Sequence, residues 1–120
     1  MGSTYRQKGD TWEYTNGSGS DIAVNSVVVM GDTVGIAEVD IADGETGAVA
    51  VTGVHEVAKA AGTAWDQGAK LDWDASTDSF DVGVTAATGD VEDCGVAAEA
   101  AASADTTGYI RLTPGTGTGA

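Results

Sequence analysis

Large apolar side chains are scarce in this sequence, and this scarcity limits what the chain can fold into. Leu, Ile, Val and Phe number 2, 4, 14 and 1, so 21 of 120 residues can build a conventional core. A fraction below roughly 20% combined with a high net charge brings a chain close to disorder. Eighteen glycines add to the entropic cost of ordering the backbone. The chain therefore gains most by oligomerising, because contacts between copies supply apolar burial that one copy lacks.

Short β-type runs separated by Gly and Asp predict an all-β fold, either a small barrel or a sandwich. A glycine at position 53 interrupts one of these runs and indicates a bulge or a close backbone approach. Two Ala-rich segments are candidates for short helical structure, namely one turn at residues 58–62 and the interval 99–104. The β-type runs cover residues 10–15, 22–30, 34–41, 48–57, 71–73, 80–85, 95–100 and 109–112.

The length predicts a single domain with a distinct segment at each end. Residues 1–10 are expected to form an N-terminal arm, and residues 11–113 form one β-rich domain. Residues 114–120 have the sequence PGTGTGA, which is typical of a flexible tail with nothing to bury.

The charge distribution is uneven and excludes several classes of protein. Nineteen acidic against five basic residues give a net charge of −14, yet residues 1–8 carry +2 through Arg6 and Lys8 and the remainder carries −16. An acidic body with no basic stripe argues against binding nucleic acid. No apolar run is long enough to span a membrane. The polar start and the single cysteine, Cys94, predict synthesis in the cytoplasm without an internal disulfide.

Residues suited to catalysis or metal binding are few, so we predict no enzyme, no cofactor and no metal. His55 is the only histidine and is expected to be a strand or interface side chain, while Cys94 is expected to be a buried or interface thiol. The acidic segment 72–81 invites comparison with calcium loops, but counting from Asp72 the sixth and twelfth positions hold Thr77 and Gly83 instead of Gly and Glu. We expect an acidic hairpin turn that caps its own backbone.

The aromatic side chains are expected to anchor most of the large-residue packing. Five of them are predicted to be core anchors: Trp12, Tyr14, Trp65, Trp73 and Tyr109.

A series of short motifs runs along the chain, of which the longest is KAAGTAWDQGAKLDWD at residues 59–74. The other motifs are residues 5–10, 27–31, 35–37, 43–47, 51–54, 95–97 and 110–112. Taken in order, they resemble a group of capsid decoration (cement) proteins of tailed bacteriophages, related to the lambda-type head-decoration proteins. The order and spacing of the motifs carry the resemblance, because each motif alone is weak.

The resemblance implies a β-rich structural protein of the virion, without catalytic residues. Proteins of this group are generally trimers on the outside of an HK97-fold capsid at three-fold and quasi-three-fold positions, where they clamp neighbouring capsomers. The major capsid protein is then the expected partner. The basic arm is our candidate for capsid contact, as a peptide that becomes ordered or adds a strand on docking. The candidate contact residues are Tyr5, Arg6, Gln7 and Lys8.

Two other classes of function stay open at this stage. An all-β carbohydrate-binding or adhesion module would use Trp12, Trp65 and Trp73 as stacking platforms. A small hydrolase would have His55, Asp72 and Asp74 as its only acid–base set.

Overall fold

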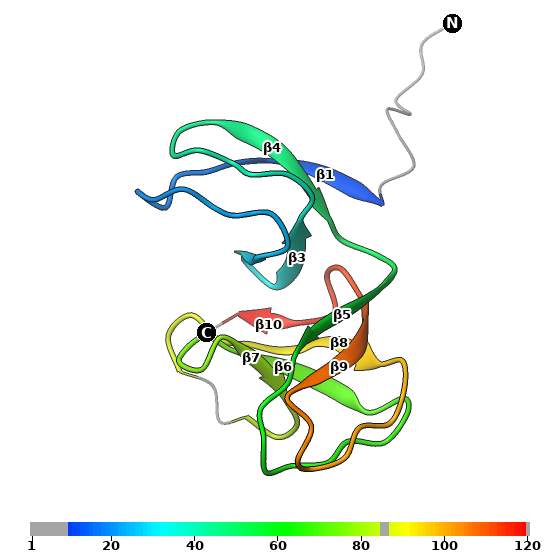
Figure 1. Ribbon diagram of the computed structural model, residues 1–120. Helices are drawn as coiled ribbons and strands as arrows, with labels where there is room; N and C mark the ends of the chain where they lie inside the picture. The colour runs from blue at the N-terminus through cyan, green and yellow to red at the C-terminus, as the bar shows by residue number, and fades with distance from the viewer. Residues whose placement is uncertain (1–9, 85–86, 120) are drawn as a thin grey trace, which may run out of the picture.

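The computed structural model describes residues 10–84 and 87–119 and shows two antiparallel β-sheets stacked on each other, without a helix among these residues (Figure 1). The all-β prediction is confirmed. No helix that could span a membrane is present in the described residues. The strands are β1 (Thr11–Thr15), β2 (Val27–Met30), β3 (Thr33–Ala37), β4 (Thr46–Ala50), β5 (Val54–Ala58), β6 (Lys70–Asp74), β7 (Ser79–Asp81), β8 (Val91–Ala97), β9 (Thr107–Leu112) and β10 (Thr118–Gly119).

The N-terminal sheet has the strand order β1-β4-β3-β2. β4 and β3 are its central strands, and the turn of the β2–β3 hairpin passes through Gly31 at a φ of 65°. A positive φ is readily adopted by glycine, so the Val-rich run can reverse tightly here. β1 and β2 form the two edges of this sheet.

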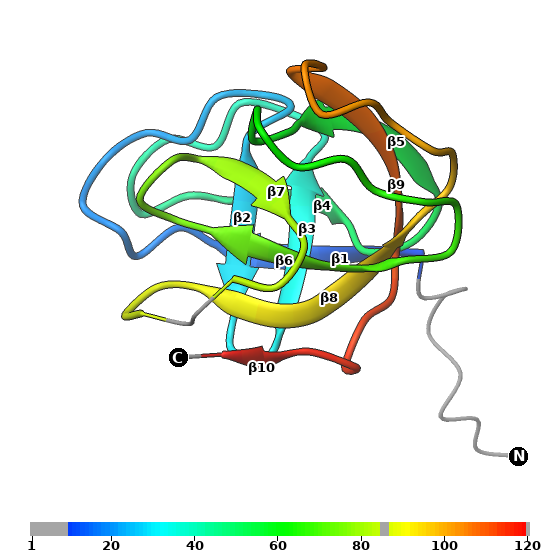
Figure 2. The same cartoon turned by 90° about the horizontal axis from the view of Figure 1, so that it is seen from below.

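The C-terminal sheet has the order β5-β9-β8-β6-β7, with β10 also pairing β8. β9 pairs the C-terminal half of β8, and β10 pairs its N-terminal half (Figure 2). The sheet curls until its two ends touch, because the amide of Ala60 donates to the carbonyl oxygen of Phe80 at 3.0 Å. The contact is limited to this bridge, so the predicted barrel does not close.

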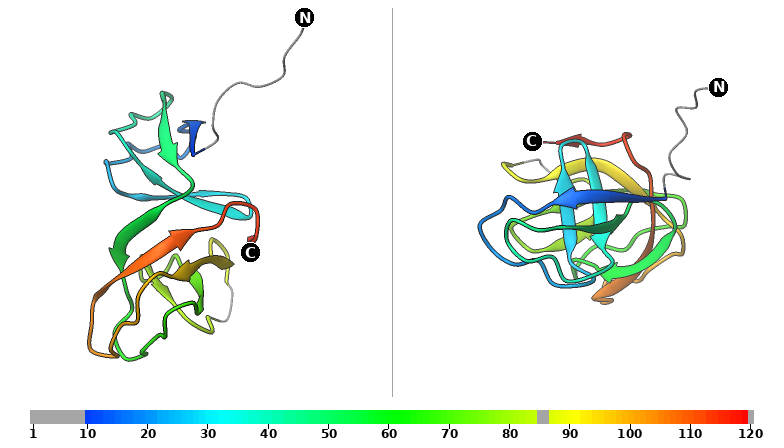
Figure 3. Two further views of the ribbon diagram at one scale, coloured as in Figure 1. Left: turned by 90° about the vertical axis from the view of Figure 1, so that its right-hand side faces the viewer. Right: turned by 90° about the horizontal axis from the view of Figure 1, so that it is seen from above.

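β3 joins the two sheets into one packed unit, because it is buried on both faces. Val34 and Ile36 enter the main core cluster together with residues of the C-terminal sheet, while Ala37 belongs to a smaller cluster within the N-terminal sheet. Within the N-terminal sheet, Gly35 lets β3 pack closely against β4, since a Cβ at its position would lie 2.3 Å from a methyl group of Val49. Figure 3 shows the two layers from the side and from above.

Two segments differ from the sequence predictions. Residues 58–62 form the end of β5 and a turn, and residues 99–104 form a loop; both expected helical segments are therefore wrong. The reason is non-local hydrogen bonding: Gly62 donates to the carbonyl of Ser103 at 2.6 Å, and Ala101 and Trp65 exchange two bonds of 3.0 Å. Within the expected tail, Thr118 and Gly119 form β10, whose backbone needs no apolar side chain in order to pair with β8.

Candidate functional site

The root of the N-terminal arm is fixed beside the link between the two sheets. The four arm residues predicted to contact a capsid, Tyr5, Arg6, Gln7 and Lys8, lie outside the described residues. Asp10 is the first described residue. Its carbonyl oxygen accepts a hydrogen bond from the amide of Val51 at 3.0 Å, and its carboxylate accepts one from the hydroxyl of Thr52 at 3.1 Å. Asp10 is therefore fixed at the chain segment that connects β4 to β5.

β1 follows the arm directly and presents an aromatic side chain at the edge of the N-terminal sheet. Trp12 lies opposite Val49 and is 38% exposed, whereas Tyr14 packs against the smaller core cluster. Exposed aromatic residues are typical of surfaces that bind other proteins.

Two of the five predicted anchors, Trp65 and Trp73, are buried in the main core. The Trp65 indole donates to the carbonyl of Glu99 at 3.0 Å, and the Lys59 ammonium group lies 5.5 Å from its ring centroid. The rings of Trp73 and Phe80 are tilted by 56° with centroids 5.0 Å apart. Neither buried indole offers a free face for stacking on a sugar, which removes two of the three platforms of a carbohydrate-binding module.

The outward face of β5 and β9 is an exposed patch with apolar and charged side chains side by side. Val54 is 57% exposed and lies opposite Arg111, while Glu56 lies opposite Tyr109, which is 39% exposed. The opposite face of the same strand pair is buried in the core, as Val57, Ile110 and Leu112 show. Tyr and Arg are enriched at protein interfaces, so this face is suited to contact with another protein.

The other edge of β5 is unpaired along most of its length. Gly53 accepts from Leu112 at 3.0 Å, and Lys59 donates to Thr106 at 2.9 Å. In an antiparallel ladder the bonded positions alternate, so the odd-numbered positions 53–59 bond to β9. The backbone groups of Val54 and Glu56 therefore point away from β9 and face an open edge. From Ala58 onward the edge is covered, because Lys59 forms a parallel bridge to Phe80.

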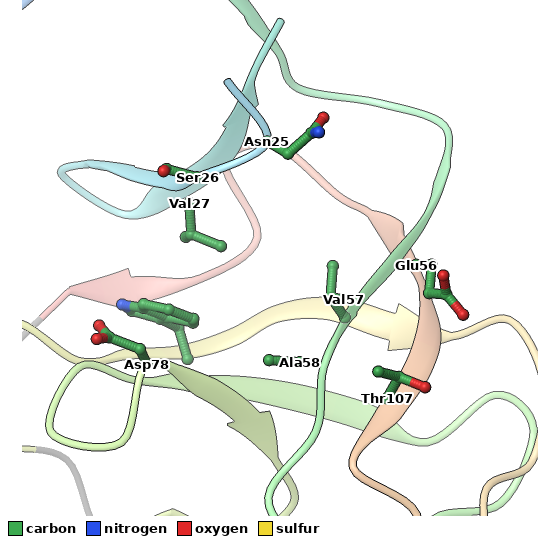
Figure 4. Close-up of a pocket in the computed structure, with 9 residues that line it drawn as sticks. Asn25, Ser26, Val27, Glu56, Val57, Ala58, Asp78 and Thr107 are labelled. Carbon is green, nitrogen blue, oxygen red and sulfur yellow. The ribbon is translucent and has the colours of Figure 1, made fainter. Parts of the chain in front are cut away.

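A groove of about 510 Å³ lies along this unpaired edge, between the two sheets. Figure 4 shows Val27 and Val57 directed into the space between the sheets, with Asp78 across from β5 and Glu56 on the outer side of it. The groove combines an apolar interior with a carboxylate at either side. Its lining residues are Asn25, Ser26, Val27, Glu56, Val57, Ala58, Trp73, Asp78 and Thr107.

The three side chains considered for a hydrolase are each occupied with the protein's own backbone. The His55 ring Nε2 bonds to the carbonyl of Thr52 at 2.9 Å. The buried Asp72 carboxylate accepts from the amides of Asp93 at 2.7 Å and Val84 at 2.9 Å. Asp74 caps its own turn, since the hydroxyl and the amide of Ser76 donate to it at 2.6 and 3.0 Å. None of these bonds joins one of the three to another.

The acidic hairpin between β6 and β7 forms as predicted, with Asp74 at the start of its turn. The hydrogen bond from the Ser76 side chain holds the pKa of Asp74 below its usual value. In the described residues, no group of three or more His, Cys, Asp or Glu side chains is placed to hold a metal ion.

The single thiol lies in the main core, within 3.5 Å of the carbonyl oxygen of Leu71. Burial, followed by the neighbouring Asp72 charge, raises the pKa of Cys94 to about 12. Because the thiolate is the reactive form, this side chain is inert near neutral pH.

Sequence reasoning missed the groove and the free edge of β5 beside it. One signal was present: the glycine at position 53 indicated a bulge or a close backbone approach, and its φ is 90°. The bend separates β4, which pairs with β1 and β3, from β5, which pairs only with β9. Which edge stays open depends on contacts between segments far apart in the sequence, and no local pattern specifies them.

Comparison with known proteins gives one informative match. A family model described as phage cement protein matches residues 6–112, which include three of the four arm residues and almost all of the β-rich domain. No match is found among curated proteins or solved structures.

Proposed function

The chain belongs to the phage cement protein family, and on this basis we propose that it decorates the outer surface of an HK97-fold phage head at three-fold and quasi-three-fold positions. Membership of the family implies a structural role in stabilising the capsid, in association with the virion, and this is not an enzyme class. The family match over residues 6–112 is the observation that carries the proposal. The bound protein clamps adjacent capsomers, after being made in the cytoplasm of the bacterial host.

The arm is the first proposed contact with the major capsid protein. Two features support it. The arm holds two of the five basic residues of the chain and no acidic one before Asp10, so it is electrostatically distinct from the body. Its root is tied by Asp10 to Val51 and Thr52, so the body positions the arm even though the contact itself is made by residues 5–8.

The second proposed contact is between copies of the chain, as a homotrimer. The exposed face of β5 and β9 supports this proposal, since Val54 and Tyr109 would be covered there and Arg111 would meet an acidic neighbour. Three copies carry a formal charge of 3 × −14 = −42. Repulsion between the copies weakens as salt screens it, so the trimer is expected to be more stable near physiological ionic strength than at low salt.

Deletion of residues 1–8 tests the capsid contact. The truncated protein is expected to keep the sedimentation behaviour of the full chain but to lose binding to expanded capsids that lack the cement protein, because the basic peptide that makes the proposed contact is missing. Binding is measured by co-sedimentation of the capsids.

A matched pair of variants controls this experiment. Lys8→Gln removes one positive charge from the arm and is expected to weaken capsid binding. Lys70→Gln removes one positive charge from an exposed position on β6 and is expected to leave capsid binding unchanged. Capsid occupancy by the truncated protein equal to that of the full chain would refute the arm contact. A sedimentation coefficient corresponding to a monomer at every salt concentration would refute the trimer.

A further inference from the structure

We propose that the groove between the two sheets receives an extended, basic segment of a capsid subunit, which adds as a strand to the free edge of β5. This inference rests on the proposed function and adds a second attachment point on the body, separate from the arm.

The backbone of β5 carries the first part of the argument. The amides and carbonyls of Val54 and Glu56 point away from β9, and no described strand pairs with them, whereas the parallel bridge between Lys59 and Phe80 already pairs the edge at the end of β5. An open edge of this kind readily accepts an added strand, whose main-chain hydrogen bonds supply affinity for any sequence. Past the end of β5, the amide of Ala60 already donates to the carbonyl oxygen of Phe80. An added strand would therefore extend the backbone pairing that covers this end of the edge.

The shape of the groove carries the second part. Its volume of about 510 Å³ lies beside the open edge, so a strand at that edge would occupy it. Val27 and Val57 face the interior (Figure 4), and Trp73 also lines the groove, which suits small or apolar side chains. Because side chains of a strand alternate between two faces, every second residue of the incoming segment would face this apolar interior.

The charge around the groove indicates which side chains the incoming segment would carry at its other positions. Glu56 and Asp78 line it, and none of its nine lining residues is basic. Above it, residues 10–50 carry eight carboxylates and no Lys or Arg. An incoming segment that alternates apolar with basic residues would therefore match both faces. A second copy of the chain fits less well, because its body carries a net charge of −16.

Hydrogen exchange measured by mass spectrometry provides the direct test, using the full chain alone and bound to expanded capsids. The peptide covering residues 54–58 is expected to exchange at least about tenfold more slowly when bound, since new backbone bonds protect its free amides. Protection of this peptide in the free protein that disappears when residues 1–8 are deleted would identify the arm as the occupant and overturn the inference.

A pair of substitutions at one position tests the strand addition itself. Glu56→Pro removes an amide on the open edge and leaves the bonds to β9 in place, since proline is tolerated on the unpaired side of edge strands. Glu56→Thr removes the same carboxylate but keeps that amide. We expect Glu56→Pro to bind capsids about tenfold or more weakly than Glu56→Thr does. Thermal unfolding of both variants verifies that they fold.

Charge reversal distinguishes the groove from the rest of the acidic surface. Glu56→Lys is expected to reduce capsid affinity about tenfold, whereas Glu45→Lys, at an exposed turn before β4, makes the same charge change and leaves affinity within about twofold. If the full chain binds capsids and folded Glu56→Pro and Glu56→Lys bind equally well, the groove inference is wrong and the proposed function stands. If the full chain does not bind capsids, both fail.

Discussion

The two sheets obtain their stability by different means. The main core cluster has twelve buried members. Ten of them lie between residues 57 and 112, and only Val34 and Ile36 come from the N-terminal sheet. The cluster within the N-terminal sheet has four, namely Val28, Ala37, Ile41 and Val49. The C-terminal sheet thus concentrates the few large side chains of the sequence. The N-terminal sheet is thinner and depends on its neighbour and on polar contacts.

Asn16 shows how polar contacts replace apolar burial in the N-terminal sheet. Its side chain is fully buried, with the amide group donating to the carbonyls of Ser20 at 2.7 Å and Ile41 at 3.0 Å. Its carbonyl oxygen accepts from the amide and hydroxyl of Ser18 at 3.0 and 2.7 Å. One side chain therefore holds together a turn and a loop that have little apolar surface between them.

Truncating a ring in the main core should produce the largest loss of stability. Phe80→Ala removes a fully buried side chain that packs on Trp73, and we expect a loss of about 3–5 kcal/mol in the free energy of unfolding. Urea titration followed by tryptophan fluorescence measures it. Val29→Ala on the exposed edge strand β2 serves as control, with an expected change below about 0.5 kcal/mol. Equal effects of the two substitutions would contradict the assignment of the core to the C-terminal sheet.

Removing the buried amide should affect the N-terminal sheet more locally. Asn16→Ala removes the two hydrogen bonds from this amide to the carbonyls of Ser20 and Ile41 and leaves a small buried cavity, and we expect a loss of about 2 kcal/mol. Hydrogen exchange should accelerate first around residues 16–22 and 41–45. Ser18→Ala, which removes one hydroxyl from the same turn, should have a smaller effect. Uniform acceleration across both sheets would show that they unfold as one unit.

Deleting residues 114–120 tests how the two sheets are joined. The amide of Gly119 donates to the Asp32 carboxylate at 2.7 Å, and that of Gly115 donates to the Thr33 hydroxyl at 3.0 Å, so β10 connects β8 to the β2–β3 hairpin. We expect a loss of about 1 kcal/mol, with faster exchange in this hairpin. Gly117→Ala should act in the same direction, since a Cβ there would lie 2.6 Å from the Asp32 carbonyl oxygen. Unchanged exchange of the hairpin in both variants would contradict this role of β10.

Lowering the pH should change the stability less than the substitutions and the deletion above. The change should come from the hairpin between β6 and β7. The pKa of Asp74 is lower in the folded protein than its ordinary value of 3.8. Its stabilising contribution is therefore complete above about pH 4 and is lost as the pH falls further, through the folded pKa. An NMR titration of the Ser76 amide is expected to show a midpoint below 3.8. Asp74→Asn should abolish that titration, and a midpoint above 3.8 would contradict the lowered pKa.

The arrangement of strands along the chain was largely predictable, whereas their partners were not. The run at 10–15 becomes β1, and the run at 109–112 lies within β9, because alternating and β-branched residues favour extended backbone locally. Of the run at 22–30, only Val27–Met30 is a strand, while Ile22 makes an isolated bridge to Ile41. The Ala-rich segments had local helix propensity, but hydrogen bonds to distant loops replaced it.

The burial of the aromatic residues was likewise only partly predictable from the sequence. The sequence identified them as the largest packing elements, yet Trp65 and Trp73 are buried while Trp12 and Tyr109 are partly exposed. Gly108 is part of the reason, because its missing Cβ leaves room for the Trp65 ring, which a Cβ would approach to 2.2 Å. A glycine far along the chain thus determines which indole can enter the core.

The sequence by itself determined the β class, the acidic body with its basic arm, and the resemblance to cement proteins that the family match confirms. These properties depend on local alternation, on charge counts and on the order of motifs, all of which are written along the chain. The tertiary structure alone decided that β3 is buried on both faces, that the last residues pair with β8, and that one edge of β5 remains open beside a groove. Each of these results depends on contacts between distant segments. Strands pair through backbone groups that nearly every residue carries, so the local sequence does not specify the partner.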